Sequence, residues 1–410
     1  MTPTLIQQVR VLDPANQTDQ TADVLIEAGK LWAIAPQLAV PAAAEIIDGQ
    51  GKIFAPGLVD LYSHSGEPGF ESRETLDSLQ QAASAGGFTR VGILPTTDPV
   101  ADHLAAVTPL QLPGLLPWGA LTLGAKGQQM SDLAELATAE IAGFTDDFPI
   151  DHELLLWRLL TYAQPLQKPI ALWPCRQTLA GGTAREGEDA LRLGLPGLPA
   201  IAETTALATL LECVAATGTA VHIMRVSTAR SVALIAQAQA AGLPVTASTT
   251  WMHLLFNTAD LETYDPNLRL DPPLGTPTDQ QALIAGLETG TLAAIAIDHT
   301  PYTYEEKTVP FGLAPAGVIG LELALPVLWQ RFVASKRWSA LQLWQYLSQQ
   351  PADCLKQAPP TLKLDQPLEA ILFDPQASWQ VTTNTLKSRS ENTPWLAQTL
   401  QGRVLQTWVA

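Results

Sequence analysis

Acidic and basic side chains of the kinds that enzymes use stand directly after short apolar runs in the middle of the chain. The runs that end near positions 59, 144, 224 and 297 are followed by Asp60 and His64, by Asp146, by Arg225 and by Asp298. Aspartate and histidine are residue types that transfer protons in enzymes. If the runs are parallel strands of a barrel, these residues gather at the end of the barrel where catalytic groups lie. They are the first candidates for a functional site.

The elements that would position these residues alternate between strand and helix. The apolar runs include 90–94, 170–173, 220–224 and 292–297, and the Ala/Leu-rich stretches between them include 74–85, 151–164, 202–217, 229–241 and 279–287. Strands alternating with helices of this length indicate βα units and a parallel sheet. Roughly eight such units over ~280 residues predict an α/β protein with a (β/α)8 barrel. A doubly wound sheet is the alternative, but no GxGxxG motif opens a helix after a strand here.

Both ends of the chain have the composition of strands instead. Short β-rich runs occur within residues 1–55, and Ala370–Phe373 and Val404–Val409 are similar runs within residues 346–410. Because chain ends often lie close together, the two ends could form one small β-domain. We therefore expect a barrel over residues 56–345 and a composite β-domain from 1–55 and 346–410.

Composition excludes several classes of protein. The chain has 410 residues, of which 47% are hydrophobic and only 15% charged, and its net charge is −17. Disordered proteins have the opposite balance of hydrophobicity and charge. Nucleic acids and anionic membranes attract basic surfaces, so we expect neither as a partner.

The cysteines and the apolar segments bear on location. Cys175, Cys213 and Cys354 are far apart and form no CxxC pair, which indicates buried thiols in a reducing compartment. The first residues contain neither a basic segment nor an apolar segment of a signal peptide. No stretch reaches the ~18 apolar residues of a membrane span. These features predict a cytoplasmic protein.

Six motifs in the barrel region resemble those of one enzyme family, in the same order along the chain. They are PGLVDLYSHSGEPGFE, GFTDDFPI, VHIMRVSTARS, LRLDPPLGT, AIDHTPYTYEEK and APAGVIGLE, and ILFDP, NTP and GRV follow in the tail. Together they resemble dihydroorotases of the amidohydrolase superfamily. The resemblance implies a barrel with a composite β-domain. For active members it implies one or two zinc ions, which serve to hydrolyse or close a cyclic amide.

The resemblance also implies that three of the family's four metal-binding histidines are replaced. Tyr62 stands where the first histidine of the family's His-x-His pair would be, and Trp173 and Arg225 stand at two later histidine positions. Arginine cannot ligate a metal because it stays protonated. Tryptophan has no lone pair to offer a metal.

Three family positions keep a metal-binding residue type. His64 is the second histidine of the pair, Asp298 is the family's metal ligand and general base, and the bridging carboxylate falls at Asp146 or Asp147, with Asp146 favoured by spacing. His64, Asp146 and Asp298 would make one weak site at most, since a catalytic zinc normally has three protein ligands and an open position. The alternatives are packing of His64 at its strand end, and a turn or helix cap at Asp146-Asp147. We assign the other histidines, including His222, His253 and His299, no ligand role.

Substrate contacts of the family are replaced as well. Gly66 stands in place of an arginine, Thr96 and Asp271 in place of asparagines, and Tyr302 in place of a histidine. With the metal histidines gone, the retained carboxylates would need another cation. We predict that Arg225 supplies it by pairing with Asp298 or Asp146.

Two hypotheses follow. The first is a catalytically degenerate dihydroorotase homologue without a cofactor. The resemblance implies that such a homologue is a structural or regulatory partner of aspartate carbamoyltransferase in pyrimidine biosynthesis, and we expect it to be a homo-oligomer. The second is an active dihydroorotase or related cyclic amidohydrolase with a rebuilt zinc site. Zinc content distinguishes the two.

Overall fold

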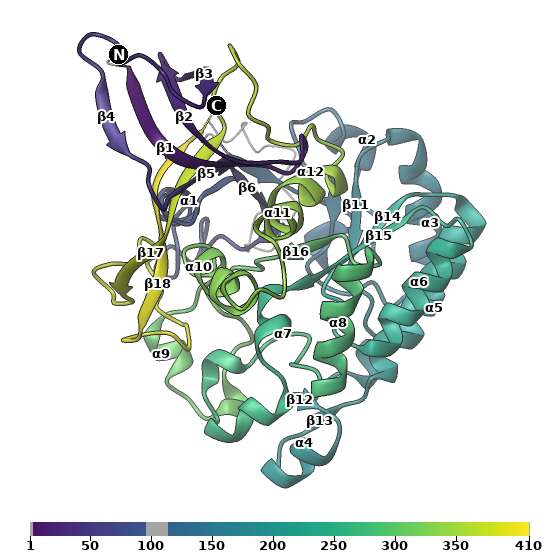
Figure 1. Ribbon diagram of the computed structural model, residues 1–410. Helices are drawn as coiled ribbons and strands as arrows, with labels where there is room; N and C mark the ends of the chain where they lie inside the picture. Colours follow the sequence, from purple (N-terminus) through teal and green to yellow (C-terminus); the bar gives the residue numbers. More distant parts are fainter. Residues whose placement is uncertain (1–2, 96–113, 410) are drawn as a thin grey trace.

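Strands from the two ends of the chain pair in one sheet in this computed structural model, which describes residues 3–95 and 114–409. The strands are β1 (Thr4–Asp13), β2 (Thr18–Glu27), β3 (Lys30–Ala35), β4 (Glu45–Asp48), β5 (Ile53–Pro56), β17 (Ala370–Gln380) and β18 (Thr399–Trp408). Their order is β18-β17-β5-β1-β2-β3, with β4 beside β1. Figure 1 shows both chain ends on this side of the molecule. The expected β-domain built from both ends is present.

Parallel strands form the barrel. They are β6 (Leu58–Ser63), β7 (Phe88–Ile93), β8 (Leu115–Pro117), β9 (Gly119–Ala120), β10 (Phe144–Thr145), β11 (Ile170–Leu172), β14 (Val221–Ile223), β15 (Val245–Thr250) and β16 (Ala294–Ala296). They pair in chain order, and only Trp118 separates β8 from β9. The barrel closes between β16 and β6, where Asp298 N donates to Tyr62 O at 3.2 Å and His64 N donates to His299 O at 2.8 Å. The short strands β12 (Ala184–Arg185) and β13 (Gly197–Leu198) pair separately.

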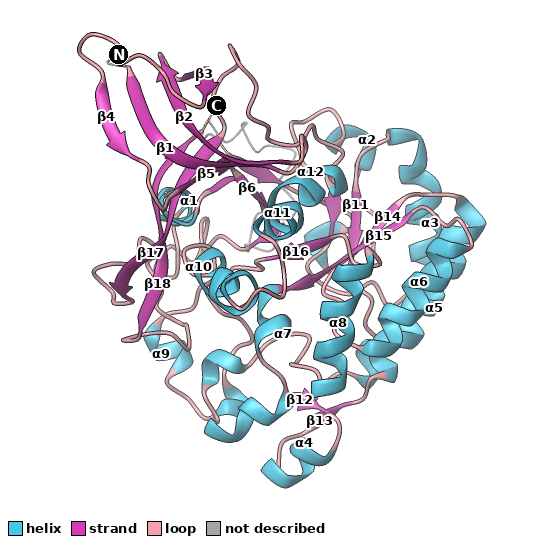
Figure 2. Cartoon of the chain, in the orientation of Figure 1, coloured by secondary structure: helices cyan, strands magenta, loops and turns pink. Residues whose placement is uncertain are grey.

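Helices cover the outside of the barrel (Figure 2). They are α1 (Leu76–Gly86), α2 (Leu133–Leu136), α3 (Glu153–Ala163), α4 (Glu188–Leu193), α5 (Ile201–Thr217), α6 (Ala229–Ala240), α7 (Trp251–Leu255), α8 (Pro277–Thr289), α9 (Tyr304–Lys307), α10 (Ala324–Leu328), α11 (Ala340–Trp344) and α12 (Gln350–Cys354). The five stretches expected to be helical correspond to α1, α3, α5, α6 and α8, and each end lies within two residues of its expected position. The barrel expected from the alternating pattern is confirmed.

Local capping explains why two of these helices begin where they do. The Thr228 side chain accepts a hydrogen bond from Ser231 N at the start of α6. At the start of α8, the Thr276 side chain accepts from Asp279 N and Pro277 is the first helical residue. Hydroxyl caps and an initial proline both favour a helix start. The Thr228 cap of α6 lies three residues after Arg225. It therefore fixes the chain just beyond the end of β14.

The last helices, α11 and α12, close the end of the barrel at which β6 begins. The π-helical turn Gln345–Gln349 joins α11 to α12. Tyr346 donates from its hydroxyl to Leu287 O at 3.1 Å, and Ser348 donates to Gly57 O, just before β6, at 2.6 Å. The domain boundaries expected at 55/56 and 345/346 stay predictions, and this helical run crosses the second of them.

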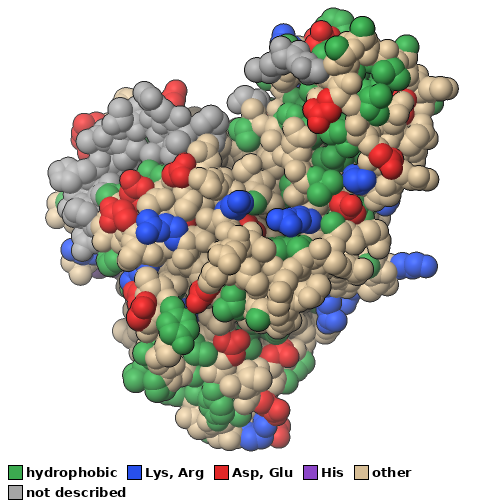
Figure 3. Space-filling model, turned by 90° about the vertical axis from the view of Figure 1, so that its left-hand side faces the viewer, with side chains coloured by type: hydrophobic (Ala, Val, Ile, Leu, Met, Phe, Trp, Pro, Cys, Tyr) green, Lys and Arg blue, Asp and Glu red, His purple; other side chains and the backbone are tan. Residues whose placement is uncertain are grey.

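The surface carries both signs of charge. Figure 3 shows, on the side of β17 and β18, Lys and Arg side chains across the middle of the face, with acidic and hydrophobic side chains above and below them. In the part of the chain that the structure describes, no helix is long and apolar enough to cross a membrane.

Candidate functional site

Side chains from the ends of five barrel strands meet in a cavity of about 380 Å³. Its lining includes His64 after β6, Asp147 after β10, Trp173 after β11, Arg225 after β14 and Asp298 after β16. These are carboxyl ends of strands, where barrel proteins hold their functional groups. Residues far apart in the sequence are thus neighbours in space.

Arg225 occupies the centre of this group. Its Nε donates to Asp298 Oδ2 at 2.8 Å, and its Nη2 donates to Asp298 Oδ1 and to Asp147 Oδ1, both at 2.7 Å. The residue is only 4% exposed. Burial alone would lower the pKa of Arg225, but the charges of Asp298 and Asp147 raise it well above its ordinary value. Of the two partners expected for Arg225, Asp298 is confirmed, whereas Asp146 is not a partner and Asp147 takes that place.

A zinc ion does not fit this arrangement. Arg225 Nη2 lies 3.3 Å from His64 Nε2 as well as 2.7 Å from the two carboxylate oxygens. One N–H donor therefore stands among the three groups that would have to approach a zinc ion to about 2.0–2.2 Å. In the two described stretches, 3–95 and 114–409, no three His, Cys, Asp or Glu side chains are grouped so that they could hold a metal ion.

The carboxylate in the cluster is Asp147, which corrects the preference for Asp146. Asp146 turns to the neighbouring strand end, where Thr122 N donates to its Oδ1 at 3.1 Å and Thr122 Oγ1 donates to its Oδ2 at 2.5 Å. Burial raises the pKa of Asp146 to about 6. Burial also opposes ionisation of Asp147, but the charge of Arg225 outweighs it and the pKa of Asp147 is lowered. Spacing alone could not show which of two adjacent aspartates faces the cavity.

Tyr62 is tied to Arg225 through its hydroxyl group. The hydroxyl accepts from Arg225 N at 3.1 Å and is hydrogen-bonded to Ser248 Oγ at 3.0 Å. Ser248 Oγ in turn lies 2.8 Å from His222 Nε2, and Thr246 Oγ1 lies 2.9 Å from the other ring nitrogen. Both nitrogens of His222 are thus used by hydroxyl groups, and burial lowers its pKa to about 3.

The aromatic replacements pack around the arginine. The guanidinium carbon of Arg225 lies 5.0 Å from the ring centre of Trp173 and 5.7 Å from that of Tyr62. Cations within about 6 Å of an aromatic face are attracted to it. The three residues that replace the family's histidines are therefore in contact with one another through Arg225: they are Tyr62, Trp173 and Arg225.

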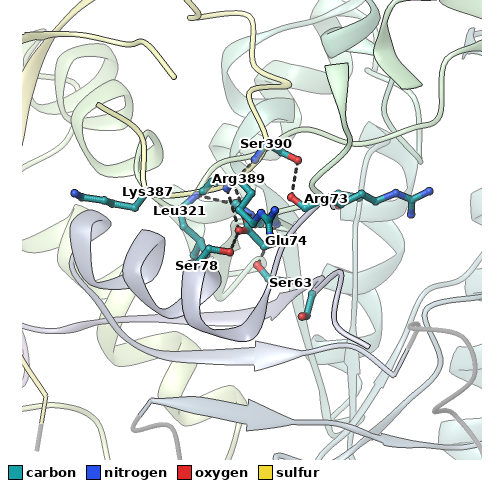
Figure 4. Close-up of polar contacts among 12 residues, drawn as sticks. Ser63, Arg73, Glu74, Ser78, Leu321, Lys387, Arg389 and Ser390 are labelled. Carbon is teal, nitrogen blue, oxygen red and sulfur yellow. Dashed lines mark hydrogen bonds and ion pairs between the residues drawn. The ribbon is translucent and has the colours of Figure 1, made fainter. Parts of the chain in front are cut away.

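Glu74 and His299 hold the loop that carries Asp298. Figure 4 shows Glu74 close to Ser78 and Arg389. His299 Nδ1 accepts from Gly320 N at 3.2 Å, so its Nε2 carries the proton and donates to Glu74 Oε2 at 3.3 Å. Glu74 is fully buried and also accepts from Ser78, from Ser388 and from Arg389 N. His299 therefore fixes this loop.

No sequence signal pointed to Glu74. Its partners lie in a different loop and near the C-terminus, 225 and 314 positions away. Contacts at such separations follow from the fold alone.

The residues that stand in place of the family's substrate contacts differ in their surroundings. A Cβ atom at Gly66 would lie 2.3 Å from Phe70 O, so this backbone has no room for a side chain there. Tyr302 and Asp271 line the cavity, and the Tyr302 ring lies 4.8 Å from the Arg73 guanidinium carbon. Thr96 lies outside the described residues.

Comparison with known proteins gives the family. A family model described as dihydro-orotase-like matches residues 51–231. A probable dihydroorotase-like protein from Synechocystis is 40% identical, over 97% of this chain and 98% of that protein. The chain belongs to the dihydroorotase-like family. Another relative of this dihydroorotase-like chain, named dihydroorotase, from Solibacter usitatus, is 35% identical over 99% of this chain and 96% of its own.

Solved structures support the fold. An L-hydantoinase (dihydropyrimidinase) from Arthrobacter aurescens has a TM-score of 0.84 and 21% identity, covering 100% of this chain and 97% of its own. A dihydropyrimidinase from Brevibacillus agri has a TM-score of 0.82, also at 21% identity, covering 100% and 94%. At this identity they show that the dihydroorotase-like chain shares an amidohydrolase-type fold.

Proposed function

We propose that this dihydroorotase-like chain is catalytically degenerate and binds no zinc at the barrel mouth. One observation carries the proposal: Arg225 Nη2 lies within 2.7 Å of both Asp147 Oδ1 and Asp298 Oδ1, and 3.3 Å from His64 Nε2. Hydrolysis of a cyclic amide requires an activated water, which a metal or a free base supplies. Both oxygens of Asp298 already accept hydrogen bonds from Arg225.

Metal content and turnover test this proposal together. The protein is purified without chelator, its zinc is measured by elemental analysis, and dihydroorotate hydrolysis and formation are assayed. The Solibacter usitatus dihydroorotase, treated identically, is the control for assay and metal supply. We expect far less than one zinc per chain and no turnover in either direction. Stoichiometric zinc with measurable hydrolysis would disprove the proposal.

The role we propose is structural or regulatory, through association with aspartate carbamoyltransferase in the cytoplasm. The retention of the whole fold supports it, since β17 still pairs with β5, and β18 with β17, while the site chemistry is altered. Light scattering after gel filtration, with and without aspartate carbamoyltransferase of the same organism, tests association. A monomer that does not bind this enzyme would contradict both the partnership and the proposed homo-oligomer.

An active cyclic amidohydrolase with a rebuilt zinc site is the second candidate. A cavity of about 380 Å³ remains, and it is still lined by His64 and Asp298. For this candidate, Arg225 would have to leave its carboxylates so that zinc could enter. The same measurement of zinc and turnover decides between the two candidates.

A further inference from the structure

We infer that the barrel-mouth cavity binds a small organic cation, a primary ammonium or guanidinium compound, with Asp271 as the carboxylate that recognises it. This concerns the cavity of the proposed function and rests on Arg225 staying between Asp147 and Asp298. The established family relationship says nothing of a cationic ligand.

The charges that line the cavity favour a cation. Three carboxylates, Asp147, Asp271 and Asp298, face two guanidinium groups, Arg225 and Arg269. Arg225 is fully engaged, because one guanidinium serves two carboxylates at 2.7 Å. The cavity therefore keeps an excess of negative charge, which attracts cations into a confined space.

Asp271 is the carboxylate that the protein itself leaves available. It is exposed and lines the cavity, and within 3–95 and 114–409 its side chain has no hydrogen bond or ion pair. Arg269 is near, and its charge acts on Asp271, but within the described residues it forms no ion pair with Asp271: its Nη1 donates to Leu270 O at 2.6 Å and its Nε has no hydrogen-bond partner. Although Asp271 is open to the cavity, the protein around it desolvates the carboxylate and raises its pKa, in spite of the charge of Arg269. A bound cation would favour the ionised carboxylate.

The remaining lining fits the apolar body of such a ligand. Phe148, 58% exposed, offers an aromatic face, and Met252 and Leu270 add apolar surface. Aromatic faces attract ammonium and guanidinium groups.

His253 adds a polar group beside this surface. It is 2% exposed, its Nδ1 lies 2.7 Å from Thr250 Oγ1, and its Nε2 has no hydrogen-bond partner of normal geometry in the described part of the chain. Burial lowers its pKa to about 4, so the ring is neutral and adds no positive charge that would repel a cation.

Calorimetric titration of the full-length protein with three matched probes tests the inference. Benzylammonium is the cation, benzyl alcohol the neutral analogue and benzoate the anion. We expect benzylammonium to bind at least about tenfold more tightly than either analogue. Stronger binding of benzoate, equal binding of all three, or no heat from benzylammonium at about 10 mM would overturn the inference.

Two variants locate the site. Asp271→Asn removes the carboxylate with little change of shape, and we expect at least a tenfold loss of benzylammonium affinity. Asp365→Asn, an exposed position away from the cavity lining, makes the same change of charge and should leave affinity unchanged. An unaltered affinity in folded Asp271→Asn would refute the assignment. Dihydroorotate turnover in the same samples reports on the proposed function separately, so the two can fail independently.

Discussion

Arg225 and Asp298 form a two-point ion pair in which both residues have left-handed backbone conformations, with φ of 54° and 52°. Nε and Nη2 of the arginine donate to the two carboxylate oxygens at 2.8 and 2.7 Å. A left-handed conformation costs a residue with a side chain roughly 1–3 kcal/mol, so it persists only where the surroundings enforce it. The pair, together with Asp147, is the kind of contact that could hold two strand ends in such conformations.

Removing the arginine should destabilise the protein strongly. Arg225→Met keeps much of the side-chain length but leaves Asp147 and Asp298, whose side chains are only 18% and 14% exposed, without a cation. Breaking a buried ion pair by removing one partner costs about 3–5 kcal/mol. We expect a loss of this size in the free energy of unfolding, measured by urea denaturation.

A combined variant shows whether unpaired charge is the cause. Arg225→Met with Asp147→Asn and Asp298→Asn removes the cation and both charges together. Its free energy of unfolding should lie closer to that of the unchanged protein than that of Arg225→Met alone does. If the triple variant is the less stable of the two, the carboxylates are not what Arg225 compensates.

Asp146 should make stability depend on pH. Its pKa is raised from 3.8 to about 6 in the folded state, so folding takes up a proton between these values. Its contribution to stability therefore falls as the pH rises through this window, by at most about 3 kcal/mol. As the pH rises from about 4 to about 7, we expect the free energy of unfolding to fall less in Asp146→Asn than in the unchanged protein.

The control for this effect is Asp48→Asn, which removes an exposed carboxylate. Asp60 and Glu322, whose pKa values burial raises to about 7, act in the same direction and remain in both variants. The comparison between variants is therefore the informative one. Identical pH profiles for Asp146→Asn and Asp48→Asn would contradict the assigned pKa.

More of the fold than of the site could be predicted from the sequence, because the signals for helices and strands are local. The Ala/Leu-rich stretches that became α5 and α6 are bounded by glycine or a threonine cap, and such signals need no tertiary contact. The prediction that Arg225 pairs with Asp298 or Asp146 combined the positions implied by the family resemblance with charge compensation. The choice of Asp147 over Asp146 depends on which way a side chain leaves a strand end. The contacts of Trp173 and Tyr62 with one guanidinium depend on three loops meeting in space.

Glu74 should be the residue that links the C-terminal segment to the Asp298 loop. Its carboxylate accepts from His299, from two serine hydroxyls and from Arg389 N. Glu74→Gln would turn an N–H₂ group toward these donors, at a cost of about 1–3 kcal/mol or more. We expect faster amide hydrogen exchange at Arg389 and Ser390. Glu71→Gln, a nearby exposed glutamate, is the matched control and should not change exchange there.

Restoring the family's histidines should return zinc affinity. In a variant with Tyr62→His, Trp173→His and Arg225→His, imidazole groups would join His64, Asp147 and Asp298 around the space that the guanidinium now fills. Vacating Trp173 can open a cavity that costs a few kcal/mol, so folding is checked first by circular dichroism. Zinc content of the folded variant, compared with Arg225→Met, measures the gain.

Hydrolysis of dihydroorotate should not return with the metal. Positioning of a bound substrate supplies about 7–11 kcal/mol of the barrier in well-oriented reactions. The family's arginine cannot be rebuilt at Gly66, because a Cβ atom there would lie 2.3 Å from Phe70 O. Asp271, in addition, would repel an anionic substrate from the cavity that it lines. We therefore expect a zinc-loaded, inactive triple variant. Turnover at ~1 s⁻¹ or more, a rate typical of enzymes, would mean that the cavity still orients the substrate and that the replaced contacts matter less than their chemistry indicates.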